Sequence, residues 1–146
     1  MYKQIVVVLC VLITASTALT GWRNCGSNMA TLHTVRMTNC TQTPCRFVRG
    51  NNYEAELDGT WRANSNSLPL VLSVVIFGIP VNILEGDACD YKTRGNCPAL
   101  NNADFTFRSY YPIPENLPAV SAVARGTILN DFGDVAVCLE LDVTLV

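Results

Sequence analysis

The sequence has little of what most catalytic and metal-binding proteins use. His33 is the only histidine among 146 residues, and no two cysteines have the two-residue separation that is typical of zinc motifs. Charged residues make up 15% of the chain, and the formal net charge is −2. The arginines are scattered, whereas nucleic-acid-binding proteins normally carry a basic patch. We therefore expect no catalytic centre, no metal, no cofactor and no nucleic-acid partner.

Long apolar runs are also lacking. The run Ile5–Ile13 near the N-terminus has nine residues, whereas a membrane-spanning helix needs about 20. Lys3 precedes this run, and small or polar residues follow it up to Thr20. This pattern is typical of a secretory signal peptide.

Small residues at the end of this leader indicate where it is removed. They permit cleavage before Leu19 or before Gly21. We expect removal at Gly21, which gives a leader of residues 1–20 and one domain of residues 21–146. The mature protein is expected outside the cell, or in the lumen of endosomes and lysosomes.

Six cysteines remain after the leader is removed. The secretory compartment favours disulfides, and an even number of cysteines is typical of a bridged framework. Their spacing favours two short bridges and one long bridge: Cys40–Cys45, Cys89–Cys97 and Cys25–Cys138. The long bridge would tie the first ordered segment to the last strand. Closing a loop of about 100 residues is worth up to about 4.7 kcal/mol in the chain-entropy description.

Alternation of apolar and polar residues predicts an all-β fold. Residues 53–62 and 135–145 alternate with a period of two, so each is expected to form a strand with one buried face. Residues 68–79 are almost all apolar, which predicts a strand buried on both faces. Shorter strands are expected over residues 32–38, 104–111 and 119–130. About seven strands without a sustained helical period favour a β-sandwich.

One predicted strand has an unusually small inward face. Its alternate residues are Val120, Ala122, Ala124, Gly126 and Ile128, and three of them have little or no side chain. A void in a core costs stability in proportion to its volume. Either neighbouring aromatic side chains fill this space or a ligand does, and the residues alone leave both alternatives open.

Several short motifs accompany the cysteines. They are Asn24-Cys25-Gly26-Ser27, Thr43-Pro44-Cys45, Gly78-Ile79-Pro80-Val81, Asn96-Cys97-Pro98, Tyr111-Pro112-Ile113 and Cys138-Leu139-Glu140. Together with the cysteine order, they resemble the Niemann-Pick type C protein 2 family of lipid carriers, within the ML lipid-recognition superfamily that includes group 2 mite allergens. The resemblance implies an immunoglobulin-like β-sandwich of two antiparallel sheets, the same three disulfides, and an apolar cavity between the sheets.

The resemblance also implies which residues contact the ligand. The mouth of the family's pocket corresponds here to Ile83, Ile113 and Leu117. Deeper positions correspond to Val35, Met37, Tyr53, Leu57, Val75, Phe105, Phe107, Tyr111, Val120 and Ala122. The mouth is aliphatic where vertebrate sterol carriers have aromatic residues, and Gly126 replaces a large aromatic inside. The composition resembles arthropod members, so a sterol or a fatty acid is the expected cargo.

These features predict a secreted, monomeric, non-enzymatic protein that binds and transfers a small hydrophobic lipid. Burying an alkyl chain gains about 0.8 kcal/mol per CH2, which can extract a lipid from water or from a membrane without chemistry. Transient contact with a membrane or a receptor is also expected. The alternatives are an innate-immunity module that presents bacterial lipid to a receptor, a semiochemical carrier, and a plain adhesion domain.

Three local features have simpler explanations than a functional site. His33 lies in an alternating segment and is expected at the surface. The carboxylates of Glu85, Asp87 and Asp90 lack the spacing of a calcium loop, so a solvated turn is expected. Asn39 begins an Asn-Cys-Thr triplet that matches the glycosylation pattern, and we regard it as a candidate acceptor.

Overall fold

The computed structural model describes residues 17–95 and 97–146, so most of the predicted leader lies outside the described residues. The elements in chain order are β1 Arg23–Asn24, β2 Ala30–Met37, β3 Cys45–Phe47, β4 Asn52–Trp61, β5 Pro69–Ile76, β6 Ile79–Asp87, the 3-10 helix η1 Ala88–Tyr91, β7 Lys92–Arg94, β8 Asp104–Pro112, β9 Ser121–Leu129 and β10 Val135–Leu145. In this part of the chain no helix is long and apolar enough to cross a membrane.

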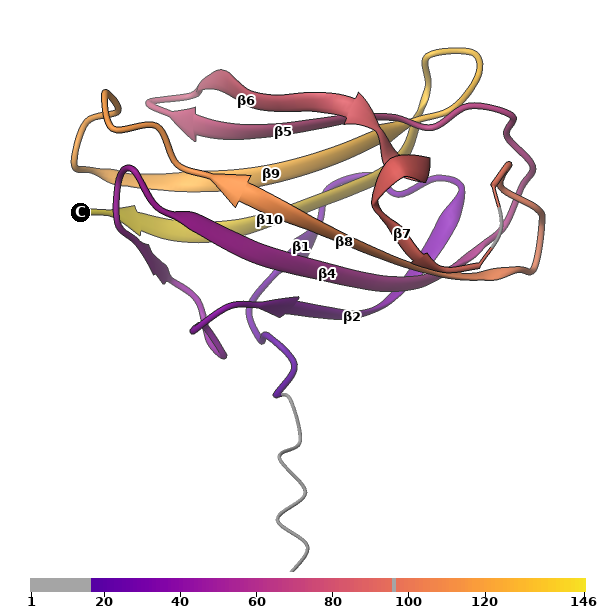
Figure 1. Ribbon diagram of the computed structural model, residues 1–146, viewed down its shortest axis with the longest axis horizontal. Coiled ribbons are helices and arrows are strands. Elements are labelled where there is room, and N and C mark those ends of the chain that lie inside the picture. The colour runs from indigo at the N-terminus through magenta and orange to yellow at the C-terminus, as the bar shows by residue number, and fades with distance from the viewer. Residues whose placement is uncertain (1–16, 96) are drawn as a thin grey trace, which may run out of the picture.

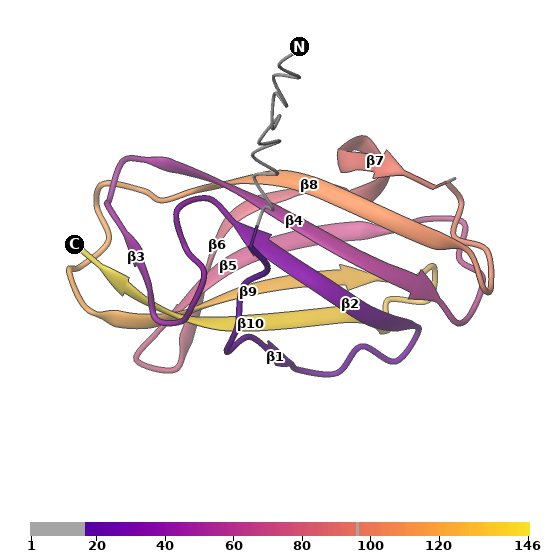
Figure 2. The ribbon, with the colours of Figure 1, turned by 90° about the horizontal axis from the view of Figure 1, so that it is seen from below.

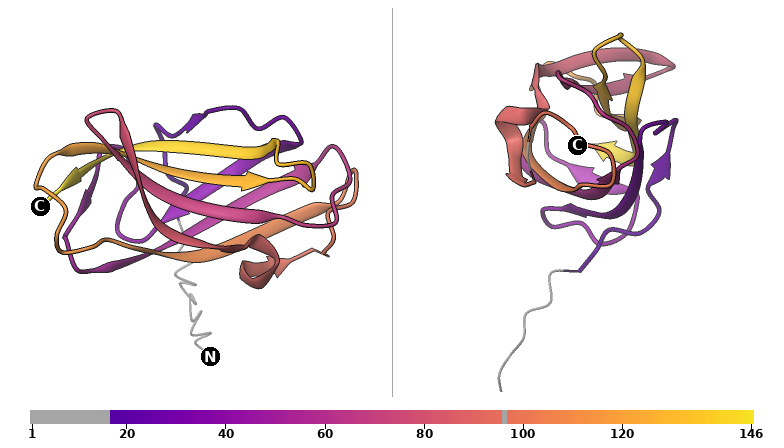
Figure 3. Two further views of the ribbon diagram at one scale, coloured as in Figure 1. Left: turned by 90° about the horizontal axis from the view of Figure 1, so that it is seen from above. Right: turned by 90° about the vertical axis from the view of Figure 1, so that its right-hand side faces the viewer.

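Two sheets face each other (Figure 1). The larger has the order β1-β10-β9-β5-β6, with β3 paired to β10, and the smaller has the order β2-β4-β8-β7. All these pairs are antiparallel except the parallel pair β3–β10. Figure 2 and the left panel of Figure 3 show the molecule from the outer sides of the smaller and the larger sheet. The predicted immunoglobulin-like sandwich is therefore confirmed.

Most predicted strands begin and end within two residues of their expected positions, and the prediction over residues 68–79 is the exception. β5 ends earlier, and the chain turns at Phe77 and Gly78, whose φ angles are 51° and 80°. A positive φ is uncommon for a residue other than glycine, so the phenylalanine gave no turn signal. β6 was missed because it contains Pro80, which a strand tolerates at a sheet edge.

Aromatic side chains pack the core at both ends of β4. Near its start, the ring of Tyr53 stacks on Phe47 with centroids 4.4 Å apart, and Phe47 lies 5.9 Å from Tyr111. At its end, the ring centroid of Trp61 lies 4.3 Å from that of Phe105. Stacked and tilted pairs of this kind stabilise a core beyond the apolar area that they bury.

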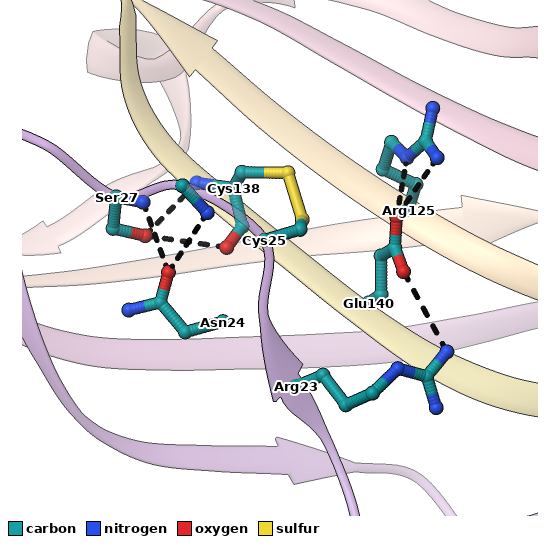
Figure 4. The surroundings of a disulfide bond; sticks show 8 residues. Arg23, Asn24, Cys25, Ser27, Arg125, Cys138 and Glu140 are labelled. Atoms are coloured by element: carbon teal, nitrogen blue, oxygen red, sulfur yellow. Dashed lines mark hydrogen bonds and ion pairs between the residues drawn. A yellow bond between two sulfur atoms is a disulfide. The ribbon is translucent and has the colours of Figure 1, made fainter.

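Three disulfides tie the sandwich together, with the pairing that the cysteine spacing favours: Cys25–Cys138, Cys40–Cys45 and Cys89–Cys97. The long bridge joins the segment after β1 to β10, and a backbone hydrogen bond from Cys25 N to Cys138 O lies beside it at 3.0 Å. The Ser27 hydroxyl also donates to Cys138 O (Figure 4). Bridge and hydrogen bonds together fix the N-terminal segment along the larger sheet.

The segment before β1 belongs to the packed structure. Leu19 is 2% exposed, and its backbone N–H donates to Val35 O at 2.7 Å. Thr20 exchanges backbone hydrogen bonds with Thr41 and Thr43. The residues that directly precede the expected cleavage site therefore contribute to the core and to backbone pairing.

Candidate functional site

An apolar cavity of about 80 Å³ lies between the two sheets. The larger sheet contributes Leu70, Leu72, Gly126, Ile128, Val137 and Leu139 to its wall, the smaller sheet contributes Ala55, Glu56, Leu57, Phe107 and Ser109, and η1 contributes Ala88 and Tyr91. The inward positions of strands from both sheets thus meet in one space. It lies along the core between the two aromatic clusters.

Small residues explain why the core is not filled here. Gly126 pairs with Leu139 on one side and with Leu72 on the other. A Cβ added at Gly126 would lie 3.4 Å from Leu72 Cδ2, which is ordinary to slightly close packing, and a larger side chain would extend into the cavity. Ala55, across the cavity on β4, contributes only a methyl group. Aromatic side chains fill part of the space that the sequence left open, and the cavity occupies the rest. That a ligand fills this cavity stays a prediction.

Some inward residues that line the cavity are more exposed than the inward residues at its end. Leu57, Leu139 and Ser109 point inward but are only partly buried. Trp61 and Phe105, at one end, are each 1% exposed. The inner face therefore changes from close packing to an unfilled apolar surface within one sandwich.

Two wall residues also line a groove on the surface. Tyr91 and Ser109 border the cavity and, on their other side, a groove formed with Lys92, Arg108 and neighbouring residues. In this groove the Arg108 guanidinium donates to Glu56 at 2.7 Å, and this hydrogen bond raises the pKa of Arg108. Charged side chains lie along this groove although most of its surface is apolar, and Tyr91 and Ser109 stand between it and the cavity.

A buried hydroxyl ties the sheets together at the other aromatic cluster. The Tyr111 phenol, on β8, donates to the backbone carbonyl of Ser73, on β5 of the opposite sheet. Burial raises the pKa of Tyr111 above its ordinary value, so the phenol stays a donor. This end of the sandwich is held by a polar contact as well as by packing.

The predicted contact residues are divided between the cavity and the rest of the core. Leu57 and Phe107 line the cavity. Val35, Met37, Tyr53, Phe105, Tyr111 and Ala122 are buried outside its wall, and Val75 and Val120 are partly buried outside it. At the predicted mouth, Ile113 and Leu117 are 2% and 7% exposed and Ile83 is partly buried. Their contact with a ligand stays a prediction.

Several wall residues had not been assigned from the sequence. The inward alternation of β9 and β10 did place Ile128, Val137 and Leu139 toward the core, so their signal was present. Tyr91 had none, because it lies in the loop between Cys89 and Cys97, where no periodic pattern exists. Only the fold brings that loop to the open side of the sandwich.

The other candidate residues lie away from the cavity wall. His33 is exposed, with Nε2 at 2.8 Å from Thr60 Oγ1, while the Thr60 hydroxyl donates to Asp104 at 2.6 Å. The threonine proton therefore points to the carboxylate, and a histidine base would need it directed to the imidazole. Asp87 accepts from Cys89 N and caps η1. Asn39 is exposed, and its glycosylation stays a prediction.

Comparison with known proteins gives consistent matches. The sequence model of the ML domain family matches residues 20–145. The NPC intracellular cholesterol transporter 2 of Sus scrofa is 21% identical over 124 residues, which cover 85% of this chain and 83% of that protein. The protein of the same name from Canis lupus familiaris is 24% identical over 126 residues, again covering 85% and 83%.

Solved structures show the same fold at lower identity. A Niemann-Pick type C2 protein from the Japanese carpenter ant matches with a TM-score of 0.75 at 14% identity, covering 86% of this chain and 99% of that one. Chicken MD-1, complexed with lipid IVa, matches with a TM-score of 0.56 at 10% identity, covering 83% and 85%.

Proposed function

The chain belongs to the ML domain family, and we propose that it is a secreted carrier that binds a lipid between its two sheets and transfers it without chemistry. The observation that supports this most is the cavity, whose wall is almost wholly apolar and comes from both sheets. The names of its relatives support the same class of ligand, because they are cholesterol transporters and a protein complexed with lipid IVa.

The size of the cavity favours a flexible ligand. At about 80 Å³ it is smaller than an engineered cavity of roughly 150 Å³ that binds benzene. Any lipid must therefore widen it. A single acyl chain is narrow enough to pass between Ala55 and Gly126 on the opposite walls, whereas a fused ring system needs more width at one place. We therefore place a fatty acid first and a sterol second.

Burial of the alkyl chain supplies the binding energy. Each CH2 that leaves water contributes about 0.8 kcal/mol, and widening the cavity offsets part of this gain. No charged side chain is needed between the sheets, because the polar end of the ligand can stay at the surface. Exposed Phe77 and Ile79, at the tip of the β5–β6 hairpin, would support transient contact with a membrane or a receptor.

Binding of a fluorescent fatty acid and of a fluorescent sterol to the purified mature protein tests the proposal. Gly126→Phe should fill the cavity and weaken fatty-acid binding at least about tenfold, or by about 1.4 kcal/mol. Thr127→Phe adds the same ring on the outer face of the same strand and should leave binding unchanged. A wild-type protein that binds neither probe, or equal losses in both variants, would contradict a ligand in this cavity.

The same cavity would also serve a lipid-recognition module. The structural likeness to MD-1 shows a shared fold, and the two functions differ in what happens to the bound lipid. A carrier should accelerate movement of a fluorescent lipid between donor and acceptor vesicles. A recognition module should retain the lipid and show no acceleration.

A further inference from the structure

The thinnest part of the cavity wall lies beside η1. Tyr91, the last residue of η1, and Ser109, on β8, each line both the cavity and the surface groove. One layer of side chains therefore separates the apolar interior from solvent at this place. Elsewhere, hydrogen-bonded strands of the two sheets form the wall.

The fold is also open on this side. β6 and β7 are edge strands of their sheets, and η1 crosses between them (Figure 1). β7 pairs with β8 at only Lys92 and Arg94, with a shift of register between them. No continuous β ladder joins the two sheets here, so a local opening breaks few backbone hydrogen bonds.

The opposite end is closed more firmly. Ile113 and Leu117, at the mouth implied by the family resemblance, are buried and do not line the cavity. Ile113 N donates to Asn51 O at 3.0 Å, and Arg49 donates to Leu117 O at 2.9 Å. Opening that end would also break the contact between Tyr111 and Ser73.

The Tyr91 side chain lies beside a glycine while η1 is anchored. A Cβ added to Gly86, on β6, would lie 3.5 Å from the Tyr91 ring and hydroxyl, so a larger side chain there would crowd the ring. The start of η1 is fixed, because Ala88 N donates to Leu68 O at 2.8 Å and Cys89 forms a disulfide. The pairing of Lys92 with Phe107 fixes the chain after η1 as well, so the Tyr91 ring would have to move by rotation of its side chain alone.

We propose that the lipid enters and leaves sideways, between η1 and β8, with Tyr91 as the gate. The acyl chain lies in the cavity, and the polar end of the ligand remains in the groove beside Ser109 and Lys92. This entrance rests on the proposed lipid-binding function. It differs from the mouth at Ile83, Ile113 and Leu117 that the family resemblance implies.

Stopped-flow binding of a fluorescent fatty acid tests the entrance. Tyr91→Ala should raise the association rate constant by about tenfold, which is about 1.4 kcal/mol of barrier, and should raise the dissociation rate constant at least as much. Gly86→Val places methyl groups under the ring and should lower both rate constants. Phe132→Ala removes an exposed ring in the loop between β9 and β10, outside the cavity wall, and is the matched control that should change neither rate constant. Ile83→Ala tests the mouth that the family resemblance implies, and it should change the rate constants less than Tyr91→Ala does.

Separate measurements test the entrance and the lipid-binding function. Equilibrium binding by the wild-type protein tests the function, and the rate constants of the variants test the entrance. If Ile83→Ala accelerates exchange while Tyr91→Ala does not, the entrance lies at the family-implied mouth and the proposal is wrong. Unchanged rates in both Tyr91→Ala and Gly86→Val would also overturn it. Thermal unfolding of each variant confirms that it is folded.

Discussion

The two halves of the core differ in how closely their side chains are packed. At the start of β4, Phe47, Tyr53 and Tyr111 fill the space between the sheets, and Phe47 is completely buried. Beside η1, the same two sheets face each other across Ala55 and Gly126 and leave a cavity. The residues are large aromatics in the first part and alanine and glycine in the second, so side-chain volume accounts for the difference.

The filled half stabilises the fold, and the half with the cavity is available for binding. Aromatic packing, the Tyr111 hydroxyl and the disulfides can hold the sandwich while the region beside η1 widens. A core packed closely throughout would resist a ligand, because protein interiors rarely contain unfilled space. Substitutions in the filled half should therefore reduce stability, and substitutions in the cavity half should mainly change binding.

The largest expected effect comes from the filled half. Phe47→Ala removes a ring that is 0% exposed and should lower the free energy of unfolding by about 3–5 kcal/mol, because it leaves a cavity that neighbours fill only partly. Leu57→Ala, in the cavity wall, already lacks packing partners on one side and should cost no more than about 2 kcal/mol. Denaturant unfolding measures both. Equal losses would remove the distinction between the two halves.

A second test concerns the N-terminal segment of the filled core. Because Leu19 is buried and Thr20 pairs with residues near the Cys40–Cys45 bridge, we expect the mature chain to begin at Leu19 rather than at Gly21. A chain that begins at Gly21 should be less stable by about 2 kcal/mol, the value of one buried leucine. N-terminal sequencing of the secreted protein gives the cleavage site directly, and a start at Gly21 would contradict this expectation.

The hydroxyl that links the sheets should contribute less. Tyr111→Phe keeps the ring and removes its hydrogen bond to Ser73, so a loss of about 1 kcal/mol is expected at neutral pH. Burial raises the pKa of Tyr111. The unfolded chain therefore releases this proton above about pH 10 while the folded chain retains it. The stability of the wild-type protein should fall above that pH. Tyr111→Phe has no phenol to ionise, so it should not show this part of the fall. Identical alkaline profiles would show that the phenol is not protected.

The strand pattern was predictable because alternation reports burial directly. β4 and β10 follow strict period-two patterns and lie where the sequence placed them. β6 was not predictable, since Phe77 adopts a turn conformation that is rare for its type and Pro80 is tolerated only at an edge. Turn and edge positions depend on tertiary neighbours that a local pattern does not contain.

Part of the cavity could be predicted from the sequence. Gly126 indicated unfilled space because the absence of a side chain can be read from the residue type. The position of that space along the sandwich depends on where Trp61, Phe105 and Phe107 place their rings, which follows from packing between strands distant in the chain. Tyr91 reaches the wall only because η1 crosses between the sheets.

The smallest expected effect lies outside both halves, at the loop between β9 and β10. The Asp131 carboxylate accepts hydrogen bonds from Ser65, Asn66 and Ser67, and these hold its pKa well below its usual range. A lowered pKa in the folded state contributes stability above the ordinary value of about 4, and this contribution is lost as the pH falls through the folded value. Asp131→Asn should therefore lower the melting temperature slightly at pH 7, and the difference from wild type should shrink below about pH 4.

Asp134→Asn, in the same loop, is the matched control. Fatty-acid binding should be unchanged in both variants, because this loop does not line the cavity. A change in binding at neutral pH would show that this loop is coupled to the cavity.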